Sequence, residues 1–182
     1  MSRGDEELLQ KAGRGDMDAL SELYVRHHRS VYSLCYQLVG DADAAEDLTH
    51  ESFLRVRRYG AGFRGGSSVT TWLYRLVRNR CLDWLARKRR DRDRHAEMAE
   101  LVRTEQREVP VDSGRQELVG RALERLTPEM REVLVLSRFG DLRYREIAEV
   151  CGISVANVKV RAHRDMKELR RVFLELEAGN EV

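Results

Sequence analysis

Residues 144–164 read YREIAEVCGISVANVKVRAHR, and this stretch decides the fold of the C-terminal half. Its first eight residues place apolar side chains at helical spacing, which predicts a short amphipathic helix. Gly152 follows where a tight turn needs positive φ, and Ser154 can cap a second helix. Ala148 is small enough for two helices to cross closely, and Val158 returns to the core. These features in this order predict a helix-turn-helix, with an ordinary helical hairpin as the alternative.

The second helix of this motif carries its cations outward. The first turns of a recognition helix enter the major groove of DNA, where Arg and Lys bind guanine edges or phosphates. Asn157 can pair with adenine or help the helix to start. The outward cations and their neighbouring imidazole are Lys159, Arg161, His163 and Arg164.

Working outward, the sequence divides into two helical blocks. A capping hydroxyl and a proline at Thr127-Pro128 predict the start of a helix that closes at Gly140. Residues 96–114 carry an acidic excess and the helix-breaking run VPVDSG, so we interpret them as a linker. We therefore expect domains at 1–95 and 115–182.

The first block predicts three helices. Asp16 is a plausible N-cap for a long helix that stops at Gly40, and a second helix is expected over about residues 43–58. The glycine-rich stretch at 59–68 must be a loop, and a third long helix follows from about Val69, capped by Ser67 or Ser68. No segment alternates as a strand does. The predicted fold is all-α, with two small helical domains joined by a linker.

Composition excludes several classes of protein. The chain has 182 residues, of which 35% are charged, but 33 basic and 31 acidic side chains nearly cancel. No apolar run approaches the roughly 18 residues of a membrane span, and the N-terminus lacks the plan of a secretion signal. The three cysteines are far apart, which favours buried free thiols over a metal or redox site. We expect a cytoplasmic protein with no cofactor and no membrane insertion.

Charge is segregated along the chain. Residues 41–52 contain five acids and no Lys or Arg, whereas residues 75–94 contain nine bases and three acids. Residues 154–172 contain six bases and two acids. Two basic helices indicate a polyanion contacted at two places. Solvated helix faces are the alternative.

The basic helix from Val69 also carries aromatic side chains. Cations beside aromatic rings near a glycine-rich loop suit single-stranded nucleic acid, because unstacked bases lie on the rings. Trp72 and Tyr74 fit the core equally well, whereas Phe63 in its glycine loop has less structural reason to be there. The residues of this group are Phe63, Trp72, Tyr74, Arg75, Arg78 and Asn79.

The acidic helix has a different outer face. It holds Asp43, Glu46, Asp47, His50 and an unexpected Leu54. An apolar side chain among acids is typical of an anchor for a basic protein partner. A solvated face with one stray leucine is the alternative. Asp47 and His50 have the spacing of a carboxylate-bridged metal site, but such sites need the motif twice. We expect no catalytic and no metal-binding residues.

The motifs together resemble the bacterial sigma factors of RNA polymerase. The runs from Asp43 to Val56 and from Thr71 to Asp83 are similar to region 2 of the sigma-70 family. The runs from Leu126 to Leu134 and from Tyr144 to Arg164 are similar to region 4. Only these two regions occur, as in the extracytoplasmic-function (ECF) group.

The resemblance implies a transcription initiation factor that is not an enzyme. Its partners would be core RNA polymerase (the clamp of the largest subunit and the flap of the second-largest), promoter DNA and an inhibitory anti-sigma factor. The acidic helix would dock on the clamp through Asp43, Glu46, Asp47, His50, Glu51 and Leu54. The basic helix and its loop would melt the −10 element with Phe63, Trp72, Tyr74, Arg75, Arg78 and Asn79. The helix-turn-helix would read the −35 element with Tyr144, Arg145, Ser154, Asn157, Lys159, Val160, Arg161, His163 and Arg164.

Two positions depart from the family pattern, and one rival function stays open. His163 stands where the family often has an aromatic residue, and His50 stands where it often has Gln. A free-standing helix-turn-helix regulator that binds an operator as a dimer would also explain residues 127–172. Such a regulator would not explain the acidic helix or the aromatic-basic helix.

Overall fold

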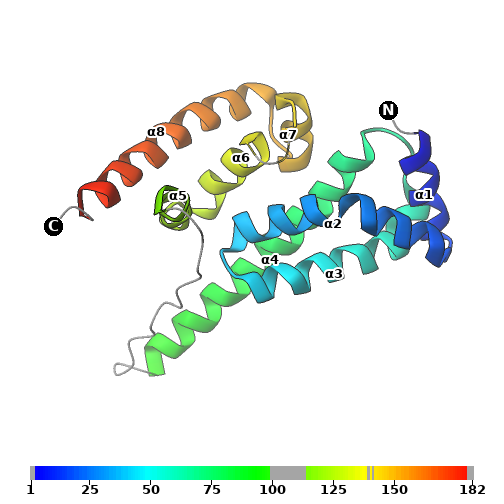
Figure 1. The fold of residues 1–182 in the computed structure, drawn as a ribbon, viewed down its shortest axis with the longest axis horizontal. Coiled ribbons are helices and arrows are strands. Elements are labelled where there is room, and N and C mark those ends of the chain that lie inside the picture. Colours follow the sequence, from blue (N-terminus) through cyan, green and yellow to red (C-terminus); the bar gives the residue numbers. More distant parts are fainter. Residues whose placement is uncertain (1–2, 99–113, 139, 141, 180–182) are drawn as a thin grey trace.

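The computed structural model describes residues 3–98, 114–138, 140 and 142–179, and these contain no β-strand. The predicted all-α fold is confirmed. The predicted linker falls mostly on residues 99–113, which lie outside the described residues. The elements are α1 (Arg3–Gly13), α2 (Met17–Val39), α3 (Ala42–Tyr59), the short 3-10 helix η1 (Gly60–Gly62), α4 (Val69–Met98), α5 (Gly114–Glu124), α6 (Pro128–Arg138), α7 (Tyr144–Cys151) and α8 (Val155–Gly179) (Figure 1).

Side-chain caps set the helix starts where the sequence predicts them. The Asp16 carboxylate accepts the Ala19 N–H at 3.0 Å to begin α2. Ser68, and not Ser67, caps α4, because its Oγ accepts the Thr71 N–H at 3.1 Å. Each cap satisfies a backbone donor that the helix itself leaves unpaired, so the boundaries follow from local chemistry.

Helix α1 was not predicted from the sequence. The sequence pattern that could have predicted it is short, with acids in the first turn followed by the apolar residues Leu9 and Ala12. In the structure these two residues are 1% and 0% exposed. A Cβ on Gly13 would lie 1.9 Å from the Ala61 backbone nitrogen, and one on Gly60 would lie 2.5 Å from the Leu9 carbonyl oxygen. Helix α1 therefore rests backbone to backbone on η1, and only glycine allows this approach.

Helices α1–α4 form the N-terminal unit around an apolar core. Val31 of α2, Ala45 of α3 and Val77 of α4 are each 0% exposed. Cys35 and Cys81 lie in this core and Cys151 is buried in the C-terminal half, all three as free thiols. This agrees with the expectation from their spacing.

Helices α5–α8 form the C-terminal unit, and α7 and α8 build the predicted helix-turn-helix. Gly152 has φ +68° and ends α7. The Ile153 N–H then donates to the Ala148 carbonyl at 3.1 Å, and the Ser154 Oγ accepts the Asn157 N–H at 3.2 Å. Val158 is 0% exposed, so the second helix is anchored in the core.

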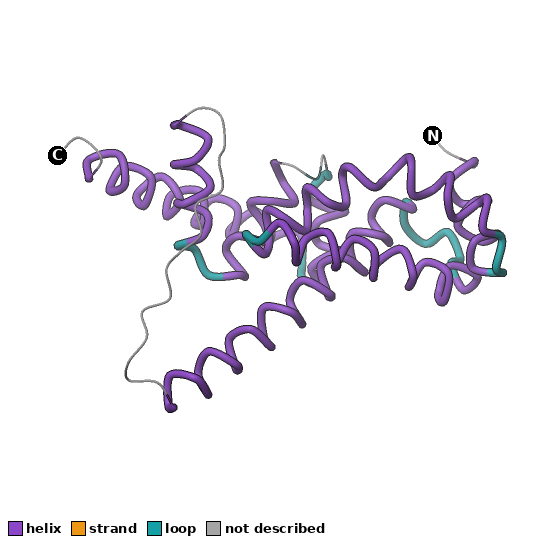
Figure 2. Tube along the Cα trace, turned by 60° about the horizontal axis from the view of Figure 1, so that its bottom comes forward, coloured by secondary structure: helices purple, strands orange, loops and turns teal. Residues whose placement is uncertain are grey.

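The two units pack against each other, which the sequence did not reveal. Helix α6 lies against α2, and α7 lies against α4 (Figure 1). Leu136 of α6 and Ile147 of α7 belong to the same apolar cluster as the core of the N-terminal unit. The C-terminal half of α4 extends beyond the other helices in both views (Figure 2). The N-terminal half of α4 is thus packed in the core, and residues 87–94 of its C-terminal half are exposed.

We expect Gly13→Ala to destabilise the protein, because the added methyl group meets backbone atoms that cannot turn aside. Overpacking of this kind costs roughly 1–3 kcal/mol. The matched control is Gly120→Ala, where an added Cβ meets nothing within 4 Å. That change should stabilise α5 by about 0.5–1 kcal/mol. Urea unfolding followed by circular dichroism measures both, and a Gly13→Ala protein as stable as the parent would contradict the close contact.

Candidate nucleic-acid and partner interfaces

The outer side of α3 is an exposed acidic face, made by Asp43, Glu46, Asp47, His50, Glu51 and Leu54. The inner side of the same helix is buried, and its hydroxyls are satisfied within the helix: Thr49 and Ser52 each donate at 2.7 Å to the carbonyl four residues earlier. Leu54 is 65% exposed. The structure therefore places this leucine in solvent among carboxylates, as the sequence predicted.

An aromatic stripe on α2, which the sequence analysis missed, adjoins this acidic face. Tyr24, His28, Tyr32 and Tyr36 follow one another at four-residue spacing, with ring centroids 4.6, 6.3 and 6.3 Å apart. Burial raises the pKa of Tyr32, and Tyr36 and the charges of Glu46 and Asp43 raise it further. The Tyr24 hydroxyl lies 3.2 Å from His50 Nε2. The four-residue spacing was the available signal, because it puts aromatic rings on one face of a helix.

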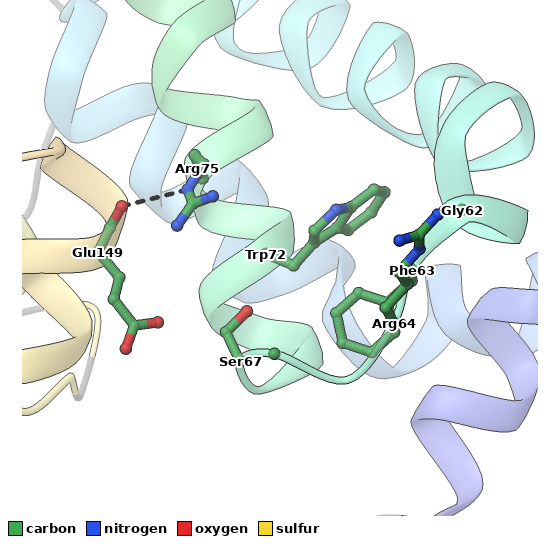
Figure 3. Close-up of a pocket in the computed structure, with 8 residues that line it drawn as sticks. Gly62, Phe63, Arg64, Ser67, Trp72, Arg75 and Glu149 are labelled. Carbon is green, nitrogen blue, oxygen red and sulfur yellow. Dashed lines mark hydrogen bonds between the residues drawn. The ribbon is translucent and has the colours of Figure 1, made fainter.

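Phe63 and Tyr74 are not exposed aromatic platforms. Phe63 is only 7% exposed, because its ring packs edge-on against Trp72 at a centroid distance of 6.0 Å. Tyr74 is 3% exposed, because it follows Leu73 on the buried side of α4. This burial corrects the expectation that Phe63 has little structural role, and for Tyr74 it favours the core alternative that the sequence left open. Phe63 remains a wall of the adjacent cavity (Figure 3).

Two cavities share Trp72 and Arg75. One of about 410 Å³ lies between the glycine-rich loop and α7, lined by Phe63, Arg64, Ser67 and Glu149 among others. A second of about 510 Å³ lies between α3 and α4 and includes Tyr59 and Asn79. Figure 3 shows the Trp72 ring between the loop and Arg75. Trp72, Arg75, Arg78 and Asn79 thus lie along one side of α4 and form the candidate base-binding surface.

The cations of this surface are already engaged. Arg75 Nε donates to the Glu149 carbonyl oxygen at 3.1 Å (Figure 3). Arg78 donates to both carboxylate oxygens of Glu132 at 2.6 and 3.1 Å, and to the Asn79 amide oxygen at 3.2 Å. Burial opposes the charged form of Arg78, but the hydrogen bonds and charge of Glu132 outweigh it and raise the Arg78 pKa.

The recognition helix α8 presents its predicted side chains to solvent. Ser154, Asn157, Lys159, Val160, His163 and Arg164 are exposed and Arg161 is half-buried, while Tyr144 and Arg145 are exposed at the start of α7. Val160 is 65% exposed. Arg164 donates from Nε and Nη2 to the Asp165 carboxylate, each at 2.8 Å. Asp165 is itself fully buried, so it fixes the direction of the Arg164 side chain.

The described parts of the chain contain neither a cluster of side chains that could hold a metal ion nor a helix that could cross a membrane. Across those ranges, no three His, Cys, Asp or Glu side chains gather closely enough to hold a metal ion. Asp47 and His50 both lie on the exposed acidic face. Among the described helices, none combines the length and the apolar character that crossing a bilayer requires.

Comparison with known proteins assigns both units. Residues 23–91 match the family model described as Sigma-70 region 2, and residues 116–169 match Sigma-70, region 4. RNA polymerase sigma-H factor of Pseudomonas aeruginosa is 31% identical over 183 residues, covering 94% of this chain and 95% of that protein. RNA polymerase sigma factor CarQ of Myxococcus xanthus is 33% identical over 172 residues, covering 93% and 97%. ECF RNA polymerase sigma factor SigW of Bacillus subtilis is 29% identical, covering 92% and 96%.

Solved structures share the fold. CnrH in complex with the cytosolic domain of CnrY superposes with a TM-score of 0.66 at 22% identity, covering 96% of this chain and 97% of that one. RpoE in complex with the anti-sigma factor NepR from Bartonella quintana gives 0.69 at 20% identity, covering 84% and 94%. ECF RNA polymerase sigma factor SigM of Mycobacterium tuberculosis is 31% identical over 179 residues, covering 97% of this chain and 88% of that protein. With both sigma regions in order and relatives above 30% identity, the chain belongs to the sigma-70 family of RNA polymerase sigma factors, in its ECF group.

Proposed function

We propose that this chain directs RNA polymerase to promoters through three surfaces: the acidic face for the core enzyme, the base-binding surface for the −10 element and α8 for the −35 element. The observation that carries the proposal is the occurrence of regions 2 and 4, in this order, in one chain. A free-standing operator-binding regulator is not favoured, since it leaves the acidic face without a partner. The site of action would be the cytoplasm, where the polymerase works.

The acidic face suits a basic partner with an apolar pocket. Its carboxylates steer a positively charged surface, and the exposed Leu54 supplies an anchor that gains free energy only when it is buried. The aromatic stripe of α2 widens the contact, because tyrosine and histidine rings bind arginine side chains on their faces. The family resemblance identifies the partner as the clamp of the largest polymerase subunit, and assigns the flap of the second-largest subunit to region 4.

The base-binding surface suits a melted strand. Trp72 lies between two cavities, so a base flipped out of the duplex has a ring to stack on and space beside it. Arg75 and Arg78 would supply cations for the phosphates once released from Glu149 and Glu132, and the exposed cations in residues 87–94 continue this charge along α4. Unstacking a base costs a few kcal/mol, which capture in such a pocket offsets.

Helix α8 suits duplex DNA. Its exposed cations and Asn157 provide donors for base edges and phosphates, and the exposed Val160 can pack on a thymine methyl group. Neither DNA contact needs to be strong alone, since both are tethered to one polymerase and the second contact becomes intramolecular. An anti-sigma partner, such as NepR is for RpoE, completes the proposal.

We expect the double change Asp47→Lys with Leu54→Ala to remove association with core polymerase while leaving the fold intact. A lost central anchor costs about 2 kcal/mol or more, which is about thirtyfold in Kd. The matched control is Asp18→Lys with Val25→Ala, which removes an exposed acid and an exposed apolar residue from α2 instead. Co-migration with the core enzyme measures both, and undiminished binding of the first variant would reject the acidic face.

We expect Trp72→Ala to weaken promoter opening by the holoenzyme, and Trp72→Phe to retain most of it. Base stacking on an aromatic ring is worth about 1–3 kcal/mol. Fluorescence of 2-aminopurine placed in the −10 element follows strand opening directly. Equal opening by the alanine and phenylalanine variants would show that no base stacks on this ring.

We expect Arg164→Ala to lower −35-dependent transcription by about fivefold or more, since one good base contact is worth about 1–3 kcal/mol. Arg170→Ala is the control, because Arg170 is also exposed on α8 but lies beyond its first turns. Run-off transcription compares promoters with intact and scrambled −35 elements. If Arg164→Ala leaves the ratio between the two promoters unchanged, α8 does not read the upstream element.

A further inference from the structure

Helix α1 lies outside the two stretches that match the sigma-70 family models, which cover residues 23–91 and 116–169. It is nevertheless built into the N-terminal unit, since Leu9 and Ala12 are buried. Helix α1 contacts η1, and η1 leads into residues 63–68. These two segments, residues 60–68, are called the pocket loop, because they form one wall of the cavity beside Trp72 (Figure 3).

We propose that α1 is a positioning element of the −10 site: it holds the pocket loop, and through it the Phe63 wall of the cavity, in the arrangement that receives a base. Gln10 is the positioning residue on α1. This role rests on the −10 function proposed above, because it concerns the same cavity. The surfaces for the core enzyme and the −35 element lie on α3 and α8, outside the pocket loop.

The pocket loop has few contacts of its own. Four of its nine residues are glycine, and Gly65 has φ +71°. Glycine loses more conformational freedom on ordering than any other residue. Within residues 61–68, all of which the structure describes, Phe63 is the one buried residue. Its N–H donates to the Gly60 carbonyl at 3.1 Å. Contacts from outside the loop therefore have to supply most of its order.

The first such contact is made by the backbone of α1. Gly13 faces Ala61 and Gly60 faces Leu9, at distances where an added Cβ would collide with backbone atoms. Backbone atoms cannot turn aside as side chains do, so this contact fixes the start of the pocket loop. The two glycines allow it because they have no Cβ.

The second contact reaches the wall of the cavity. The Gln10 side chain is half-buried, and its Nε2 donates to the Phe63 carbonyl at 3.5 Å. The Phe63 ring packs edge-on against Trp72, with centroids 6.0 Å apart. A continuous series of contacts thus runs from α1 through Phe63 to the ring on which we place the base.

Helix α1 is itself fixed to α2. Asp5 is 9% exposed, and its carboxylate accepts from Arg26 Nη1 at 2.6 Å and lies 2.9 Å from His27 Nε2. Hydrogen bonds to a charged group are among the strong ones. Helix α1 is therefore attached to α2 near its start and to η1 near its end. A loop that is ordered before a base arrives loses less conformational entropy on binding, which favours capture.

The test is Gln10→Ala in the full chain, assembled with core polymerase on a promoter fragment. Fluorescence of 2-aminopurine measures opening of the −10 element on the intact fragment and on fragments with one abasic site in that element. The abasic penalty is the ratio of opening on the two fragments. In the parent, loss of the captured base should lower opening at least about fivefold, as expected for one base stacked on an aromatic ring.

We expect the abasic penalty to be at least about twofold smaller in Gln10→Ala, because two changes that act through one pocket are not additive. A change that only weakens the fold lowers opening on both fragments alike and leaves the ratio unchanged. Gly13→Ala reaches the same loop through the Ala61 backbone and should reduce the penalty as well. Its lower stability does not alter a ratio.

The matched control changes the outer side of α1. Glu7 and Lys11 form an exposed ion pair at 2.8 Å. Glu7→Gln with Lys11→Gln removes this pair at constant net charge, and it should leave the abasic penalty at the parent's value. Co-migration with core polymerase should be the same for the parent, the control and Gln10→Ala.

Hydrogen exchange in the free chain examines the loop without DNA. The Phe63 amide should exchange at least about fivefold faster in Gln10→Ala, the change expected when a hydrogen bond that holds the loop is lost. Amides within α8 should exchange at the parent's rate, which separates loosening of the loop from loss of the fold. A Phe63 amide with an unchanged rate overturns the role of Gln10.

The abasic fragments separate the two levels of inference. An abasic penalty that stays at the parent's value in both Gln10→Ala and Gly13→Ala overturns the positioning role of α1 and leaves base capture intact. A parent that shows no abasic penalty at any −10 position overturns base capture itself, and the role of α1 with it.

Discussion

Burial of one side of α4 is the constraint on which the other surfaces depend. Leu73, Val77 and Cys81 are at most 2% exposed against α2 and α3, so the rotation of α4 about its axis is fixed. That rotation directs Trp72, Arg75 and Asn79 to the neighbouring side. Close packing leaves no freedom to turn the helix without opening cavities in the core. The positions of Trp72, Arg75 and Asn79 therefore follow from the apolar contacts of the adjacent side of α4.

The same helix links recognition to conformation. A cation that binds phosphate has to be accessible to solvent, whereas a cation within an interface is buried. The Arg78 side chain is 19% exposed, so it is neither fully buried nor fully accessible. Its bidentate pair with Glu132 joins α4 to α6 and so connects the two units.

Predictions of candidate residues succeeded where one helix face decided exposure. Leu54 is exposed because the buried positions of α3 leave it on the outer side, and the recognition helix shows its cations for the same reason. The prediction that Phe63 has little structural role was wrong, because its ring is buried. The loop folds back because α1 rests on η1 and Gln10 donates to the Phe63 carbonyl at 3.5 Å, and no periodicity within the loop carries that information.

The sequence by itself determined the helices, their caps, the helix-turn-helix and the separation of acidic and basic surfaces. These are encoded by residues within a few turns of one another, where hydrogen bonds and spacing act locally. Only the tertiary structure decided that the two units share a core and that Arg75 and Arg78 are engaged. Those bonds join residues 74 and 54 positions apart, and the Arg131 contact with Leu38 spans 93. Contacts at such separations depend on how whole helices pack, which no local pattern in the sequence specifies.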